Sequence, residues 1–105
     1  MVLNWFQTTE VDDLADRLAG TLVKRIPVAR FGDYSKKAVV IKIKTRETML
    51  RQVRDFTSKR SLNVYKKARL ANQFKWRLRE AGYPKEFVDE MAFELAAVMA
   101  TTLKI

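Results

Sequence analysis

The chain has 105 residues, of which 48% are hydrophobic and 31% are charged, and this mixture is typical of one globular domain. It contains no cysteine and no histidine, which excludes disulfides, zinc fingers, thiolate nucleophiles and every reaction that uses an imidazole as base. We therefore expect a protein that is not an enzyme, with no catalytic residue, no metal and no cofactor.

The formal net charge of +9 is unevenly distributed along the chain. Fifteen basic and three acidic residues give residues 35–81 a net charge of +12, whereas residues 1–34 carry −1 and residues 82–105 carry −2. A basic block of this kind attracts polyanions such as DNA, RNA or an anionic membrane surface, and net charge also keeps a protein soluble. The charge pattern thus favours a nucleic-acid partner without requiring one.

Nothing in the sequence indicates export or membrane insertion. The first ten residues, MVLNWFQTTE, lack the basic residues and the small-residue cleavage site of a secretory signal. No run of 18 apolar residues occurs, so we expect no transmembrane segment and a cytoplasmic location.

The first helix is predicted from about residue 10 to about residue 25. Its apolar residues follow the helical spacing i, i+3, i+4 and i+7, and they are Val11, Leu14, Ala15, Leu18 and Leu22. Thr9 begins the sequence Thr-Glu-Val-Asp, which resembles a capping box. Pro27 should end the helix, because the residue before a proline is pushed out of the α region, and residues 27–35 should form a loop.

Residues 38–45, AVVIKIKT, fit two structures. They are β-branched and alternate as a half-buried strand does, which would give an α+β fold with a β-hairpin around residues 22–45. The partner segment of that hairpin contains Pro27, which would interrupt an interior ladder. The helical alternative has Ser35 as its N-cap and an apolar stripe of Val39, Ile43, Leu50, Val53 and Thr57, flanked by Met49 and Phe56. We favour one long helix over residues 36–59, because no second strand is convincing.

Two further helices follow in the sequence. Ser61 is a candidate N-cap for a helix over about residues 62–81, and Gly82 occupies the position where a left-handed residue often ends a helix. Pro84 suits the first turn of a last helix over about residues 84–102. The apolar face of the first of these helices comprises Val64, Ala68, Ala71, Phe74, Leu78 and Ala81. The apolar face of the second comprises Phe87, Val88, Met91, Leu95, Val98 and Met99.

This inventory predicts an all-α fold, with one helical domain over residues 1–105 that forms a small bundle of about four helices with short connections. The second and third helices meet through about three residues, Lys59 to Ser61, which is the length used by helix-turn-helix units that read DNA. Many helical domains contain such a junction without binding DNA, so the junction alone assigns no function.

Residues 64–80, VYKKARLANQFKWRLRE, combine basic and aromatic side chains. One ridge opposite the apolar face holds two aromatic rings, two guanidiniums and one amide, from Tyr65, Arg69, Asn72, Trp76 and Arg79. Guanidiniums pair with phosphates, and aromatic rings stack on unpaired bases. The candidate residues for binding DNA or RNA are therefore Tyr65, Lys66, Lys67, Arg69, Lys75, Trp76 and Arg79.

The same helix fits a second function, that of a protein-interaction or regulatory module in which the chain forms a homodimer or binds another protein. In that case the aromatic residues of the ridge pack beneath Trp5 and Phe6 or against the partner. An acidic stripe of Glu86, Glu90 and Glu94 would then complement basic helices across a symmetric interface.

Two other groups of charged residues admit ordinary explanations. Basic residues of the second helix and its end would extend a positive surface or pair with acids of the end helices, and they are Lys36, Lys37, Lys42, Lys44, Arg46, Arg51, Arg54, Lys59 and Arg60. The acids at Asp12, Asp13 and Asp16 suit a helix N-terminus, whose dipole favours negative charge.

Overall fold

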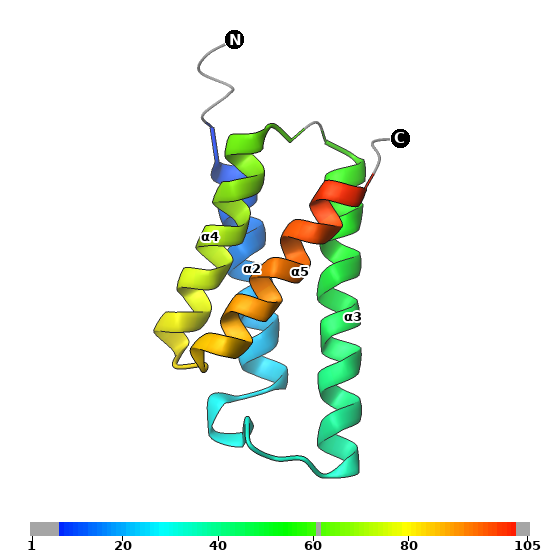
Figure 1. Ribbon diagram of the computed structural model, residues 1–105, viewed down its shortest axis with the longest axis vertical. Coiled ribbons are helices and arrows are strands. Elements are labelled where there is room, and N and C mark those ends of the chain that lie inside the picture. The colour runs from blue at the N-terminus through cyan, green and yellow to red at the C-terminus, as the bar shows by residue number, and fades with distance from the viewer. Residues whose placement is uncertain (1–6, 61, 103–105) are drawn as a thin grey trace.

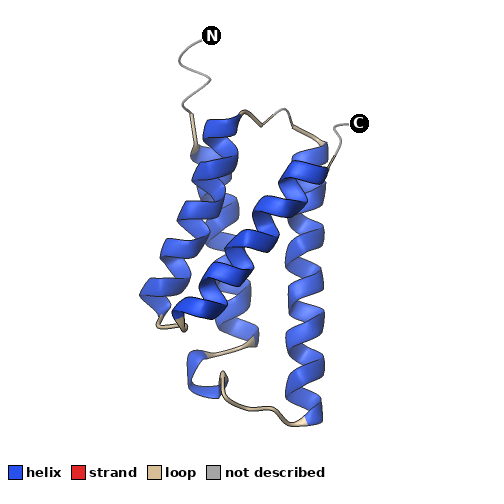
Figure 2. Cartoon of the chain, viewed as in Figure 1, coloured by secondary structure: helices blue, strands red, loops and turns tan. Residues whose placement is uncertain are grey.

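The computed structural model describes residues 7–60 and 62–102, and within these residues it contains helices and no strand (Figure 1). Its elements are α2 (Thr9–Arg25), the short 3-10 helix η1 (Val28–Arg30), α3 (Lys36–Ser58), α4 (Val64–Ala81) and α5 (Lys85–Thr101). The predicted all-α fold is confirmed. The alternative with a β-hairpin around residues 22–45 is wrong, because residues 36–45 form the first turns of α3 (Figure 2).

The sequence around Ser35 explains why α3 is a helix despite its β-branched residues. The Ser35 Oγ accepts a hydrogen bond from the backbone N–H of Ala38 at 3.3 Å, as predicted for an N-cap. Valine and isoleucine have a slightly lowered helix propensity. A helix nevertheless satisfies its backbone groups within one segment, whereas a strand here would need a second strand that the chain does not supply.

Successive helices run in alternating directions, with α3 at one edge of the molecule and α4 at the opposite edge (Figure 1). α2 packs most extensively on α4, and α5 packs on both α4 and α3. The apolar side chains that these helices bury together are Val11, Leu14, Ala15, Leu18, Ala19, Leu22, Ile26, Met49, Val53, Phe56, Leu70, Phe74, Leu78, Tyr83, Val88, Met91, Leu95 and Met99. None of the described helices is long and apolar enough to cross a membrane.

The start of α2 differs from the predicted capping box at Thr9. The N-cap residue is Thr8, and its side chain makes no capping bond to the backbone. Its Oγ1 instead donates a hydrogen bond to Oδ2 of Asp12 at 3.0 Å. The apolar residues predicted to face the core, by contrast, are all buried, and they are Val11, Leu14, Ala15, Leu18 and Leu22.

The buried residues of α3 begin at Thr45, the tenth residue of the helix. Its buried residues are Thr45, Met49, Val53, Phe56 and Thr57. Val39 and Ile43 were predicted to face the core, but they are 37% and 51% exposed. The first turns of α3 extend past the ends of α4 and α5 (Figure 1), so neither of these helices covers them.

α4 also departs from its prediction at the N-terminal end. Its N-cap is Asn63, whose Oδ1 accepts a hydrogen bond from the N–H of Lys66 at 2.8 Å, whereas the predicted cap, Ser61, lies outside the described residues. The buried residues of α4 are Leu70, Phe74 and Leu78, spaced four apart. Val64 is 80% exposed, and Ala68 and Ala81 are exposed as well, so the predicted apolar face is wrong at both ends of the helix.

The structure differs from the prediction for the connection before α4 and agrees with the predicted helix end after it. The α3–α4 connection covers residues 59–63 and is therefore longer than the three-residue junction predicted for a helix-turn-helix unit. Gly82 ends α4 in the left-handed conformation, with a φ of 100°, as predicted. Pro84 is the N-cap of α5, one position before the predicted first turn. The predicted core residues of α5 are buried or partly buried, which confirms that face of the helix.

Tyr83 joins the α4–α5 connection to the end of α2. Its side chain is 3% exposed, and its hydroxyl lies 3.3 Å from the carbonyl oxygen of Leu22 and 2.5 Å from that of Ile26. Its ring packs against Phe31 and Phe87, with centroid distances of 5.9 and 5.6 Å. Burial raises the pKa of Tyr83. This contact between distant segments fixes the end of the bundle from which α3 extends.

Candidate functional site

The seven candidate residues all lie on α4, and they differ in exposure. Trp76 is 60% exposed, Tyr65 is 41% exposed, and Arg79 is exposed as well. Lys66 and Lys67, in the first turn of the helix, are half-buried. The two remaining residues contact the neighbouring helices.

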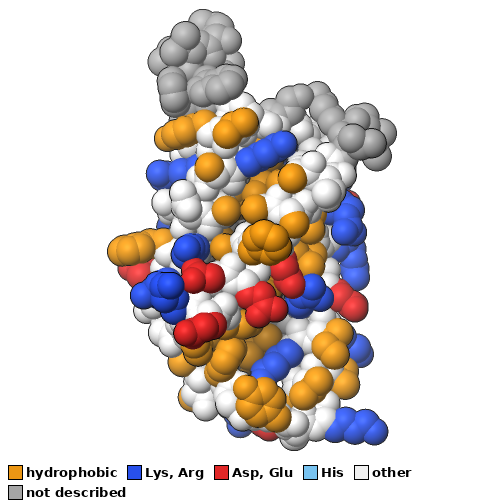
Figure 3. Space-filling model, in the orientation of Figure 1, with side chains coloured by type: hydrophobic (Ala, Val, Ile, Leu, Met, Phe, Trp, Pro, Cys, Tyr) orange, Lys and Arg blue, Asp and Glu red, His pale blue; other side chains and the backbone are white. Residues whose placement is uncertain are grey.

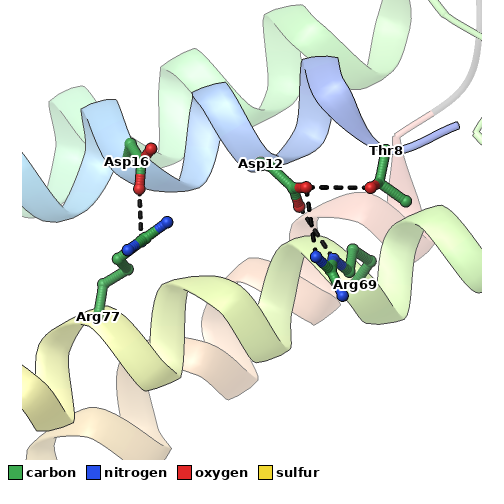
Figure 4. Close-up of polar contacts among 5 residues, drawn as sticks. All are labelled: Thr8, Asp12, Asp16, Arg69 and Arg77. Carbon is green, nitrogen blue, oxygen red and sulfur yellow. Dashed lines mark hydrogen bonds and ion pairs between the residues drawn. The ribbon is translucent and has the colours of Figure 1, made fainter.

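Arg69 points toward α2 and forms an ion pair with Asp12 (Figure 4). Its Nε donates to Oδ1 at 2.9 Å and its Nη2 donates to Oδ2 at 3.3 Å, while Thr8 donates to the same carboxylate. The hydrogen bonds from Arg69 lower the pKa of Asp12, and the same contact raises the pKa of Arg69. Arg77 and Asp16 form a second ion pair between α4 and α2 (Figure 4).

Lys75 makes an ion pair with α5 on the other side of α4. Its Nζ lies 3.0 Å from Oδ1 of Asp89, and the Nζ of Lys85 lies 3.4 Å from Oδ2 of the same carboxylate. The contact with the Lys75 ammonium is the main cause of the lowered pKa of Asp89. Three cations of α4 are thus occupied in holding it against α2 and α5, which leaves less positive charge for a ligand.

The flanking basic residues were predicted either to extend a positive surface or to pair with acids of the end helices. Two of them, Arg46 and Arg60, make such pairs. Arg46 donates from Nε and Nη2 to the two carboxylate oxygens of Glu94 at 2.7 and 2.6 Å, and this contact raises the pKa of Arg46. Arg60 donates from Nε to Glu10 at 2.8 Å. The acidic stripe of α5 is therefore partly used within the same chain.

Five cations of α3 are exposed and make no ion pair within the described residues, and we call this set the α3 basic face: Lys36, Lys37, Lys44, Arg51 and Arg54. Lys37, Lys44 and Arg51 are seven residues apart, which is about two turns, so they lie on one side of the helix. Figure 3 shows basic side chains along the edge of the molecule that α3 forms. These residues were predicted only as flanking charges, although the seven-residue spacing of Lys37, Lys44 and Arg51 is present in the sequence.

Trp76, on the ridge of α4, is 60% exposed. Trp5 and Phe6, the residues predicted to cover it, lie outside the described residues. Phe93 of α5 is also exposed, at 74%. The exposed rings of Trp76 and Phe93 are accessible both to a nucleic acid and to a protein partner.

The described acids do not form a metal-binding group, because no three of them in residues 7–60 and 62–102 come close enough together to hold an ion.

Comparison of the chain with protein-family models, with curated proteins and with solved structures found no significant match.

Proposed function

We propose that the protein is a non-enzymatic nucleic-acid-binding protein that holds the phosphate backbone on the α3 basic face. The observation that supports this proposal is the difference between the two central helices. Arg69, Lys75 and Arg77 of α4 are paired with carboxylates, whereas the five cations of the α3 basic face are not. A cation that has no carboxylate partner is free to displace the counterions of a phosphate.

The arrangement of the two helices makes α3 the better candidate. α3 and α4 lie at opposite edges of the molecule, so their basic residues form two separate surfaces (Figure 1). Arg51 and Arg54 of α3 add guanidinium forks to the lysines before them. Glu47 and Asp55 are the acids of α3, and they leave the face net positive.

The length of α3 is sufficient for several phosphate contacts. Its 23 residues span about 35 Å at 1.5 Å per residue, and residues seven apart are separated by about 10 Å along the axis. Both DNA and RNA present phosphates over such a distance, and contacts of this kind are largely independent of sequence. We therefore expect binding that depends strongly on salt and weakly on base sequence.

Two matched triple variants test the proposal. The first replaces Lys44, Arg51 and Arg54 of α3 with alanine, and the second replaces the α4 candidates Arg69, Lys75 and Arg79. Both remove three positive charges, so the net charge of the two proteins is equal. Fluorescence anisotropy with labelled DNA and RNA oligonucleotides should show a large loss of affinity for the α3 variant and a smaller one for the α4 variant. Equal losses would mean that net charge alone attracts the ligand, and the reverse order would move the site to α4.

A protein-interaction role is the second candidate, and the exposed apolar side chains support it. Ile43, Trp76 and Phe93 are 51%, 60% and 74% exposed, and a protein partner would remove such apolar surface from water. A homodimer would cover some of them. Sedimentation equilibrium over a wide concentration range tests this role, since a mass that stays that of one chain would exclude the homodimer.

A further inference from the structure

A cavity of about 310 Å³ lies between the end of α2, η1 and the start of α3, and cations dominate its lining. We call this cavity the basic pocket, and its charged residues are Lys24, Arg25, Arg30, Asp33, Lys37 and Lys42. The five cations and one carboxylate leave a net charge of +4 around a single small volume. Sequence spacing does not predict this cluster, because its cations come from three segments of the chain.

The cations of the basic pocket lack acidic partners. Lys24, Arg25, Arg30 and Lys37 are exposed and make no ion pair among the described residues. Asp33 makes no ion pair among the described residues. Its Oδ1 accepts a hydrogen bond from the backbone N–H of Ser35 at 2.9 Å, which is the main cause of its lowered pKa, and the charges of Lys42 and Arg30 lower that pKa further. The pocket therefore keeps its excess positive charge in the free protein.

The fold holds the fifth cation, Lys42, in place beside the pocket. Its Nζ donates to the carbonyl oxygens of Phe31 at 2.9 Å and Asp33 at 2.8 Å. It also lies 5.4 Å from the ring centroid of Phe31 and 4.5 Å from that of Tyr34. These contacts fix the ammonium group without neutralising it, since carbonyls and rings carry no net charge. Repulsion among like charges at this end of the molecule would be relieved by a bound anion.

We infer that the basic pocket binds a group of linked phosphates. Each phosphate carries about one to two negative charges, so two or three of them match the net charge of the pocket. Ile26, Pro27 and Ile41 supply apolar wall beside the cations, which suits the non-phosphate part of such a ligand. The phosphates have two sources, a free nucleoside triphosphate or the triphosphorylated 5′ end of an RNA. The basic pocket shares Lys37 with the α3 basic face, and its other four cations, Lys24, Arg25, Arg30 and Lys42, do not belong to that face.

The test measures the unfolding temperature of the full chain with tripolyphosphate, adenosine triphosphate and, at equal ionic strength, sulfate. Tripolyphosphate and the nucleotide should raise the unfolding temperature well above the value in sulfate, because a ligand that binds only the folded state stabilises it. A shift that is no larger with tripolyphosphate than with sulfate would overturn the proposal. Comparing 5′-triphosphate RNA with 5′-hydroxyl RNA of the same sequence then distinguishes the two sources.

Four single variants separate this pocket from a general attraction to positive charge. By calorimetry, Lys24→Ala and Arg30→Ala should each weaken tripolyphosphate binding about fivefold. Asp33→Asn should tighten it by a similar factor, because the amide oxygen still accepts from Ser35 and the negative charge is gone. Arg51→Ala, outside the pocket, should leave it unchanged. Equal weakening by Arg30→Ala and Arg51→Ala, or no tightening by Asp33→Asn, would contradict a defined site.

The variants also keep the two proposals apart. If the double variant Arg51→Ala, Arg54→Ala loses oligonucleotide binding and retains tripolyphosphate binding, the two surfaces act independently. If oligonucleotide binding fails in the wild type while tripolyphosphate still binds, the pocket stands and the proposed nucleic-acid function does not.

Discussion

Arg69 of α4 and Asp12 of α2 lie 57 residues apart in the sequence and are joined by two hydrogen bonds, Nε to Oδ1 at 2.9 Å and Nη2 to Oδ2 at 3.3 Å. Both residues had other expected roles, Arg69 as a phosphate ligand and Asp12 as a helix N-terminal acid. Their contact shows that the cations of α4 help to assemble the helices. It is the reason that the proposed binding surface lies on α3.

The pair predicts a specific dependence of stability on acidity. The pKa of Asp12 is below its ordinary value of 3.8 in the folded state, mainly through the hydrogen bond from Arg69. The pair therefore stabilises the fold fully above the unfolded-state pKa and loses this contribution as the pH falls through the folded-state pKa. Urea unfolding should show Asp12→Asn less stable than the wild type at neutral pH, with a difference that shrinks in strong acid. A difference that is unchanged between neutral and strongly acidic solution would refute this account of the pair.

Two glycines should respond in opposite directions to the same substitution. Gly20 is exposed within α2, and an added Cβ would meet nothing within 4 Å, so Gly20→Ala should raise the free energy of unfolding by about 0.5–1 kcal/mol. Gly82 has a φ of 100°, so Gly82→Ala should lower it by about 1–2 kcal/mol. Chemical denaturation measures both values. Space does not explain the second effect, because the Cβ at residue 82 would lie 3.8 Å from Val28.

The buried hydroxyl of Tyr83 should contribute measurably to stability. Tyr83→Phe removes the group that reaches the carbonyl oxygens of Leu22 and Ile26, and it should lower the free energy of unfolding by about 1–2 kcal/mol. Tyr34→Phe is the matched control, since Tyr34 is 76% exposed and its ring is retained over Lys42. Similar results for the two variants would show that the Tyr83 hydroxyl has no special role.

The sequence predicted the buried residues correctly where other helices cover the whole apolar face of a helix. The periodicity of α2 predicted its buried residues, and Ser35 and Gly82 marked helix ends through their local hydrogen bonding and backbone preference. Periodicity identified an apolar side of α3 at Val39 and Ile43 but could not show that no helix covers it. The covered length of a helix depends on the tertiary arrangement, which local sequence does not contain.

The candidate site was harder to predict for the same reason. The sequence predicted that Arg69, Lys75 and Trp76 lie on one helix, but it did not predict which residues of the other helices lie opposite them. Whether a cation is free depends on acids far away in the chain, such as Asp12 for Arg69 and Asp89 for Lys75. Exposure of Trp76 likewise depends on packing rather than on spacing.

Trp76 offers a direct way to distinguish binding at α3 from binding at α4. In a Trp5→Phe protein, Trp76 is the single tryptophan, and its exposure of 60% predicts ready quenching by iodide or acrylamide. Because α4 lies at the edge opposite α3, a bound oligonucleotide should leave quenching by acrylamide unchanged (Figure 1). Protection of Trp76 by the oligonucleotide would instead place the nucleic acid on the ridge of α4, where the ring can stack on a base.

The salt dependence of oligonucleotide binding tests the central claim most directly. Five phosphate contacts on the α3 basic face predict a slope of about −4.5 in a plot of the logarithm of the affinity against the logarithm of the salt concentration, with duplex DNA. Replacing Lys44, Arg51 and Arg54 with alanine should reduce the slope to about −2, since each lost contact removes about 0.9. The matched variant at Arg69, Lys75 and Arg79 should retain a slope close to that of the wild type. A wild-type slope near zero, or a slope reduced by the α4 variant and not by the α3 variant, would contradict the account.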